Sequence, residues 1–161
     1  MGNTNYPDGV KGAGVLVCEE VTFTETSGAG TYAGSVAVPA GAYIVDIIVQ
    51  NLALWTNAGT ATMIVGDAGD PDGFYTAVNL KATDLTAGQT ICLDMPGGKQ
   101  GAYVTVGTYP DSHVLGRYNA SARSITGSVT TSSTGGGAGR TRMLVLYVQP
   151  TPTAIVAASK A

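Results

Sequence analysis

Charged side chains are scarce in this chain of 161 residues. Its 8 Lys and Arg and 11 Asp and Glu make up 12% of the sequence, whereas an average domain carries about 25%. Much of the surface must therefore consist of Thr, Ser, Ala and Gly. The formal net charge of -3 also excludes the basic footprint with which proteins displace counterions from phosphates, so we expect no nucleic-acid partner.

Histidine occurs once, so a His-based general base or metal centre would have to be built on His113 alone. Asp111, Ser112 and His113 are consecutive, and adjacent side chains on an extended chain point to opposite faces, which excludes a proton relay among them. The sequence contains no Gly-x-Ser-x-Gly turn, His-Glu-x-x-His helix or phosphate-binding loop. We therefore predict that the protein is not an enzyme and needs no cofactor.

Long apolar runs are missing as well. No stretch approaches the roughly 20 apolar residues of a membrane helix, and the first residues lack a basic segment followed by an apolar one, which would mark a secretory signal. We expect no membrane partner and synthesis in a cytoplasm. The two cysteines, Cys18 and Cys92, lie far apart in apolar, strand-like surroundings. They are interpreted as buried structural residues, with a disulfide as the alternative.

Period-2 alternation of apolar and polar residues is the dominant pattern, and no helical stripe appears. We predict an all-β fold: a single-domain β-sandwich, jelly-roll-like, spanning 14–148, with an extended N-terminal arm at 1–13 and a C-terminal tail at 149–161. The expected strands cover 15–23, 32–38, 43–49, 60–65, 74–78, 90–93, 102–106, 113–118, 124–130 and 140–148.

Three strands carry more detailed expectations. Glu19 and Glu20 interrupt the alternation of 15–23, which indicates a bulge or bend. The segments 43–49 and 143–148 are apolar on both faces, which is typical of central strands covered on both sides.

Two groups of carboxylates are candidate sites. Asp67, Asp70 and Asp72 lie in one Gly-rich loop and form a weak candidate for Ca²⁺, although their spacing fails the EF-hand pattern and tight turns use the same residues. The acidic residues outside this loop are candidates for the carboxylate pair of a glycoside hydrolase if the fold brings them together; they are Glu19, Glu20, Glu25 and Asp46.

An apolar loop contains the single tryptophan. Leu54 and Trp55 lie between two expected strands, where they either cap the end of the core or contact another subunit.

Beyond these patterns, parts of the sequence resemble a known family. The opening Asn3-Thr4-Asn5-Tyr6-Pro7-Asp8-Gly9-Val10 is similar to the start of many small structural proteins of tailed bacteriophages. The segments 38–49, 61–67 and 70–74, with Pro-Ala-Gly before a strand and Gly-Asp after one, resemble the β-rich head decoration or cement proteins of such phages.

This resemblance implies a non-enzymatic virion protein on the outer surface of the capsid, whose partners are the major capsid protein and further copies of itself, as a trimer. It also implies that the terminal arm reaches across coat subunits, which here assigns capsid binding to Asn3, Asn5, Tyr6, Pro7 and Val10. Two alternatives stay open: a phage tail, fibre or baseplate β-module, and a Ca-dependent carbohydrate-binding domain or hydrolase.

Overall fold

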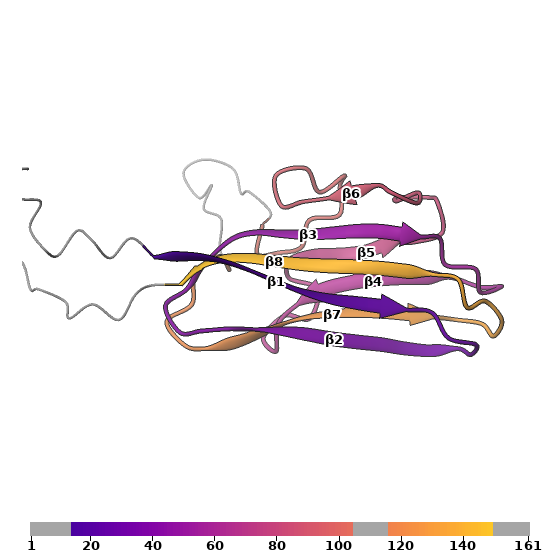
Figure 1. Cartoon of the computed structure of the whole chain (residues 1–161), viewed down its shortest axis with the longest axis horizontal. Helices are drawn as coiled ribbons and strands as arrows, with labels where there is room; N and C mark the ends of the chain where they lie inside the picture. Colours follow the sequence, from indigo (N-terminus) through magenta and orange to yellow (C-terminus); the bar gives the residue numbers. More distant parts are fainter. Residues whose placement is uncertain (1–13, 105–115, 150–161) are drawn as a thin grey trace, which may run out of the picture.

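Eight β-strands form two sheets in the computed structural model, which describes residues 14–104 and 116–149 (Figure 1). The strands are β1 (Val15–Thr24), β2 (Gly30–Val38), β3 (Tyr43–Ala53), β4 (Ala61–Gly66), β5 (Tyr75–Asn79), β6 (Thr90–Ile91), β7 (Arg123–Thr131) and β8 (Arg140–Gln149). Within these ranges there is no helix, and so none that could cross a membrane. The predicted all-β sandwich is confirmed.

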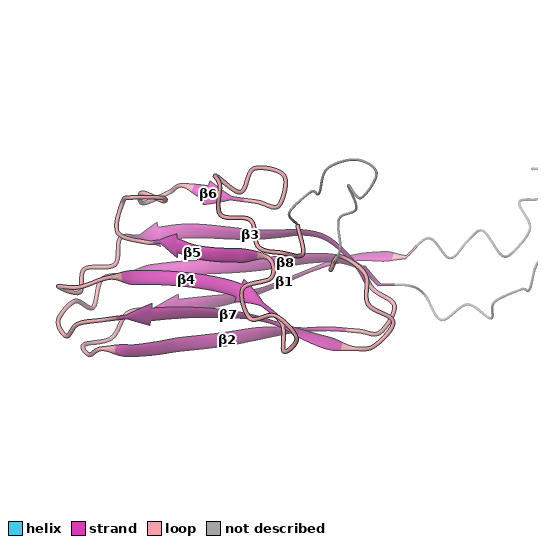
Figure 2. Cartoon of the chain, turned by 180° about the vertical axis from the view of Figure 1, so that it is seen from behind, coloured by secondary structure: helices cyan, strands magenta, loops and turns pink. Residues whose placement is uncertain are grey.

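The order of the strands defines the topology. One sheet has the order β1-β8-β3-β6 and the other β2-β7-β4-β5, and neighbouring strands in both sheets are antiparallel. The first strand pairs with the last, the second with the last but one, and so on inward, which gives the pairs β1–β8, β2–β7, β3–β6 and β4–β5. The first and third of these pairs lie in one sheet, and the second and fourth lie in the other. This double Greek key is a jelly roll. The two sheets face each other along their length (Figure 2).

Inward side chains of both sheets make the core. Ile47, Met63 and Val145 are fully buried members of it, each at an inward position of a strand. The two sheets are close together at Gly127 on β7, where a Cβ atom would lie 2.7 Å from the Phe23 ring of the opposite sheet. A side chain at this position would therefore force the Phe23 ring to shift.

Predicted strand details are confirmed in part. β3 and β8 are central strands of their sheet, but their outer faces are not fully covered within the chain, since Tyr43 and Val45 are exposed. The bulge predicted at Glu19 and Glu20 is wrong: β1 pairs with β8 without interruption, and the register shift falls instead in β3, between Ile44 and Asp46.

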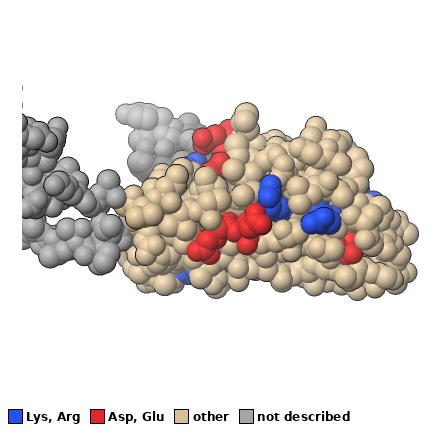
Figure 3. Space-filling model, in the orientation of Figure 1, with Lys and Arg blue, Asp and Glu red and all other residues tan. Residues whose placement is uncertain are grey.

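Other expectations also need correction. Residues 102–104 form a turn rather than the start of a strand, and Tyr118 makes only an isolated bridge to Tyr43. Cys18 is exposed and Cys92 half-buried, both as free thiols, so the prediction of two buried cysteines is wrong. Cys18 lies on the outer face of an edge strand, where alternation alone cannot distinguish solvent from core. Most of the surface drawn in Figure 3 carries no charge.

Candidate functional site

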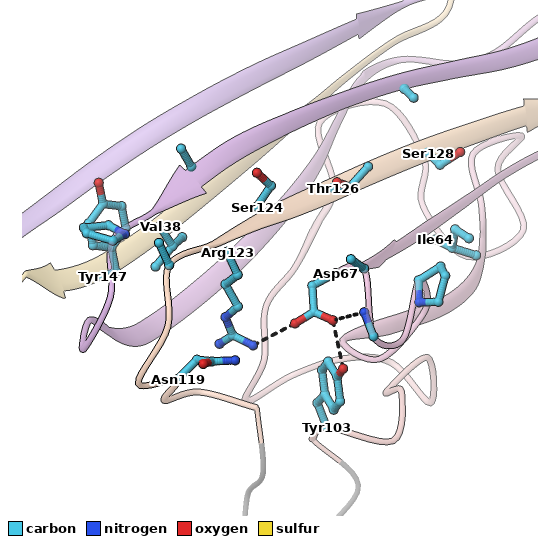
Figure 4. Close-up of a pocket in the computed structure, with 17 residues that line it drawn as sticks. Val38, Ile64, Asp67, Tyr103, Asn119, Arg123, Ser124, Thr126, Ser128 and Tyr147 are labelled. Carbon is cyan, nitrogen blue, oxygen red and sulfur yellow. Dashed lines mark hydrogen bonds and ion pairs between the residues drawn. The ribbon is translucent and has the colours of Figure 1, made fainter.

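A groove of about 1170 Å³ lies against the outer face of the sheet β2-β7-β4-β5. Its floor consists of small or short side chains at outward positions of three strands: Ala33, Ala37, Ile64, Ser124, Thr126 and Ser128. Loop residues 67–71 and Tyr103 border it at one end (Figure 4). The floor therefore offers hydroxyl groups and flat apolar surface without a charge of its own.

An ion pair closes the end of the groove. The Nη1 atom of Arg123 donates to Oδ2 of Asp67 at 2.9 Å, and each side chain is only 9% exposed. The other carboxylate oxygen, Oδ1, accepts hydrogen bonds from the Tyr103 hydroxyl at 2.9 Å and from the backbone N–H groups of Gly69 and Asp70 at 2.9 and 3.2 Å. Arg123 also donates to the carbonyl of Gly116. Asp67 thus joins the 66–73 loop to β7 and to the turn that contains Tyr103.

The charge state of Asp67 follows from these contacts. Burial alone would raise the pKa of this carboxyl, but the hydrogen bonds from Tyr103 and Arg123 outweigh burial and hold the pKa below its usual value. The same carboxylate, together with burial, raises the pKa of the Tyr103 hydroxyl to about 12. Asp67 is therefore an ionised hydrogen-bond acceptor whose two oxygens are both in use.

The contacts of Asp67 disfavour the calcium alternative. Arg123 supplies the positive charge that Ca²⁺ would supply, and a cation on Asp67 would have to displace it. Desolvation, together with the hydrogen bond and the negative charge of Asp72, raises the pKa of Asp70. Among residues 14–104 and 116–149, no three His, Cys, Asp or Glu side chains are placed to hold a metal ion together.

Aromatic packing keeps the ion pair in position. The rings of Phe74 and Tyr103 meet edge to face with centroids 5.3 Å apart, and the guanidinium of Arg123 lies 5.6 Å from the Phe74 centroid. Gly73 packs directly on the Tyr103 ring, where a Cβ atom would come within 2.5 Å. Sequence reasoning singled out the acidic loop but missed Tyr103 and Arg123, which are distant in sequence and carry no motif.

A second carboxylate holds loops together at the other end of the sandwich. Glu25 is only 2% exposed and accepts backbone hydrogen bonds from Thr56 at 2.9 Å, Asn57 at 2.8 Å, and Gly137 and Gly139 at 3.0 Å. Burial would raise the pKa of Glu25, but these four N–H groups outweigh it and place the pKa far below its ordinary value of 4.5. Its function is to bind the β3–β4 and β7–β8 loops.

The remaining carboxylates do not form a hydrolase pair. Glu19 and Glu20 point to opposite faces of β1, where Glu19 accepts from the Tyr147 hydroxyl at 2.9 Å and Glu20 pairs with Arg142 at 3.4 Å. Asp46 accepts from the backbone N–H groups of Ile47 and Leu93. Glu25 lies beyond the far end of β1. The four side chains are thus used separately, as structural acceptors.

Trp55 belongs to the core rather than to a surface contact. Its side chain is buried, its Nε1 donates to Oγ1 of Thr141 at 2.9 Å, and Gly139 packs on its ring. The expectation that Trp55 contacts another subunit is therefore corrected in favour of the capping alternative, because its side chain is only 2% exposed. Leu54 is half-buried, and a subunit contact through it stays a prediction.

Several sequence-predicted residues lie outside the described ranges. They are the arm residues Asn3, Asn5, Tyr6, Pro7 and Val10, and the consecutive Asp111, Ser112 and His113.

Comparison with known proteins identifies the fold. Chains from three bacteriophage capsid structures are similar to this one. A chain of the acidic stable capsid of Helicobacter pylori bacteriophage KHP30 is 15% identical with a TM-score of 0.52, and the match covers 86% of this chain and 91% of that chain. A chain of the cyanophage Pam1 capsid asymmetric unit is 18% identical with a TM-score of 0.53 (93% of each chain covered), and a chain of the capsid of Ralstonia phage GP4 is 23% identical with a TM-score of 0.51 (92% of this chain and 91% of that chain covered). No family model and no curated protein sequence matches.

These likenesses cover almost the whole of each chain. The chain therefore has the jelly-roll fold found in chains of phage capsid structures, and the resemblance to phage head proteins is confirmed at the level of the fold.

Proposed function

We propose that the protein is a structural, non-enzymatic component of a tailed-phage virion, which decorates the outer surface of the capsid and stabilises it by binding across coat subunits as an oligomer. One observation carries this proposal: the likeness to chains of three phage capsid structures extends over 86–93% of this chain and 91–93% of the others. The shared unit is thus the whole domain and not an isolated motif.

The surface chemistry supports binding rather than catalysis. Asp67 and Glu25, the two acids whose pKa values are lowered, each accept several hydrogen bonds from the protein itself, so neither is available to a substrate. The groove on the outer sheet offers Ser and Thr hydroxyls and small apolar side chains to a partner. Such a surface suits a contact with another protein more than with a highly charged ligand.

Residues 1–13 are the proposed capsid-binding arm, with Asn3, Asn5, Tyr6, Pro7 and Val10 as its contacts. They precede β1, which begins at Val15 at one end of the sandwich. An arm that becomes ordered on binding can span a large surface, and many identical weak contacts on a shell add through multivalency. The partner is the major capsid protein, and assembly takes place in the cytoplasm of the bacterial host, where the chain is synthesised.

Copy number in purified virions tests the proposal. Quantitative mass spectrometry should find this chain in a number comparable to that of the major capsid protein, because a decoration protein occupies repeated positions on the shell. A ratio many times lower would refute decoration in favour of a tail, fibre or baseplate module. Absence from virions would refute a structural role altogether.

A further inference from the structure

The free edges of the two sheets differ in how they are protected. Each sheet ends in two edge strands, β1 and β6 in one sheet and β2 and β5 in the other. An open edge presents unpaired N–H and C=O groups that can pair with another chain, and natural proteins shield their edges by short strands, charges, proline, bulges or a covering segment. Three of these four edges are shielded in such a way, and β2 is the exception.

The three shielded edges use different means. β6 has only two residues, and β1 carries the consecutive charges of Glu19 and Glu20. β5 has five residues and a register shift in its pairing with β4. Its other side is covered by residues 99–101, where the N–H of Thr76 donates to the carbonyl of Lys99 at 2.9 Å.

β2 has none of these features. It runs over nine residues, Gly30–Val38, with no charged residue and no proline, and it pairs with β7 along its whole length without a register shift. Figure 2 shows β2 at the border of its sheet, with β7 on one side only. Within residues 14–104 and 116–149, only β7 makes hydrogen bonds to the backbone of β2. The edge of β2 is therefore long, regular and open.

The register identifies the backbone groups that face this open side. In an antiparallel pair, the N–H and C=O groups of one residue point to the same side of the strand, and the side alternates along the chain. The N–H of Ser132, just after β7, donates to the carbonyl of Thr60, just before β4. Thr131 and every second residue before it therefore turn towards β2, where their partners begin with Gly30. The residues between these partners face the open edge, and they are Thr31, Ala33, Ser35 and Ala37.

These four residues make the edge accessible to another main chain. All four are exposed, and each offers one N–H donor and one carbonyl acceptor. Their side chains are short, so they leave the backbone groups within reach. Donors and acceptors that recur at the spacing of a strand match the main chain of an extended polypeptide, which binds by adding a strand to the sheet.

A carboxylate beside the edge adds a charge requirement. A Cβ atom at Gly34 would lie 2.6 Å from Cγ2 of Val21, so β1 lies directly against the inner side of β2. Glu19 occupies the next inward position of β1, opposite the buried Val145. It is exposed and accepts from the Tyr147 hydroxyl at 2.9 Å, and among the described residues it has no ion-pair partner. An added strand would bring an inward side chain near this carboxylate.

We propose that the edge of β2 accepts an extended segment of the major capsid protein as an added strand, with a Lys or Arg side chain of that segment beside Glu19. Charge favours this occupant over a second copy, because two copies joined along β2 would bring both Glu19 carboxylates to one side of the joined edge without a cation. The contact rests on the proposed function and deepens it, since it gives the domain itself a binding surface in addition to the arm.

Hydrogen exchange of the full chain tests the pairing. Mass spectrometry with fragmentation that resolves single amides compares the chain free in solution with the chain bound to capsids assembled without it. In the free chain, the amides of the four edge residues should exchange rapidly, because water is their partner. On capsids they should exchange at least about tenfold more slowly, whereas the amides of β1, the other long edge, should keep their rates.

Ala33→Pro tests the role of the main chain. Proline removes an N–H that faces the open edge and leaves the bonds to β7 in place, which edge strands tolerate. The variant should keep its Tm and bind capsids at least about tenfold more weakly. Ala33→Ser is the matched control, because it keeps the N–H and should bind like the wild type. Ala37→Pro repeats the test at a second position, and Glu19→Gln should weaken binding and reduce its dependence on salt.

The outcomes separate this contact from the proposed function. If the wild-type chain does not bind capsids, the proposed function fails and the contact fails with it. If the wild type binds while the edge amides of β2 still exchange rapidly, or if Ala33→Pro and Ala33→Ser bind alike, the added strand is refuted and the proposed function stands.

Protection of the edge amides in the free chain would also overturn the proposal. Protection that increases with protein concentration would identify a second copy as the occupant. Protection that disappears on deletion of residues 1–13 would identify the chain's own arm. Capsid binding that Glu19→Gln leaves unchanged would overturn the assignment of a cation to the coat segment.

Discussion

Replacing Glu25 by glutamine should lower the free energy of unfolding by about 2–6 kcal/mol, because it leaves at least two N–H donors without an acceptor, at about 1–3 kcal/mol each. The side chain is 2% exposed. Its Oε2 accepts from the N–H groups of Thr56, Gly137 and Gly139, and its Oε1 accepts from the backbone and side-chain nitrogens of Asn57. Glutamine keeps one acceptor oxygen and presents an NH₂ group in place of the other.

The magnitude follows from this exchange of donor for acceptor. Whichever oxygen is replaced, at least two N–H donors lose their acceptor, one of them on a buried residue, Asn57 or Gly139, and each unsatisfied group costs about 1–3 kcal/mol when buried. For a domain of this size the loss corresponds to a fall in Tm of about 10 °C. Glu20→Gln is the control, because Glu20 is exposed and has one ion pair at 3.4 Å, worth at most about 1 kcal/mol.

Thermal and urea unfolding of both variants, followed by circular dichroism, measures the difference.

The pH dependence of stability adds a second readout. The folded pKa of Glu25 lies far below 4.5, so the folded state binds fewer protons than the unfolded state between these values. The stabilisation is complete above about pH 4.5 and decreases as the pH falls towards the folded pKa. Wild-type stability should therefore fall more steeply below pH 4.5 than that of Glu25→Gln. If Glu25→Gln and Glu20→Gln lowered the free energy of unfolding equally at neutral pH, the reasoning would be refuted.

Three further outcomes are expected. Deleting residues 1–13 should leave Tm nearly unchanged while weakening attachment to capsids, and a truncated protein that saturates capsids as fully as the intact chain would contradict the arm. Asp67→Asn should destabilise the fold by about 3 kcal/mol because it leaves Arg123 buried without its charge partner, whereas millimolar Ca²⁺ should not raise the wild-type Tm; a rise would restore the calcium site. Gly127→Ala should cost about 1–3 kcal/mol in urea unfolding, because its methyl group would meet the Phe23 ring; an unchanged midpoint would mean that the sheets move apart without cost.

Alternation of apolar and polar residues was sufficient to predict most of the strands, because burial on one face leaves a period of two in the sequence. β3 and β8 were predicted as central for a different reason, because 43–49 and 143–148 are apolar on both faces. Edge strands were harder. β1 has a single buried residue, Phe23, so Glu19 can occupy an inward position and still reach the Tyr147 hydroxyl. Two adjacent glutamates therefore suggested a bulge where none exists.

The polar contacts that fix the two ends of the sandwich were beyond sequence reasoning. Glu25 binds amides 31 and 112 residues away, and Asp67 binds Arg123 56 residues away. Most partners of Glu25 are backbone N–H groups, which carry no sequence signal. Trp55 was ambiguous for a related reason, since its contacts come from Gly139 in the β7–β8 loop and from Thr141 on β8, both distant in sequence. Such contacts depend on the order of the strands in the sheets, which the alternation of apolar and polar residues alone does not determine.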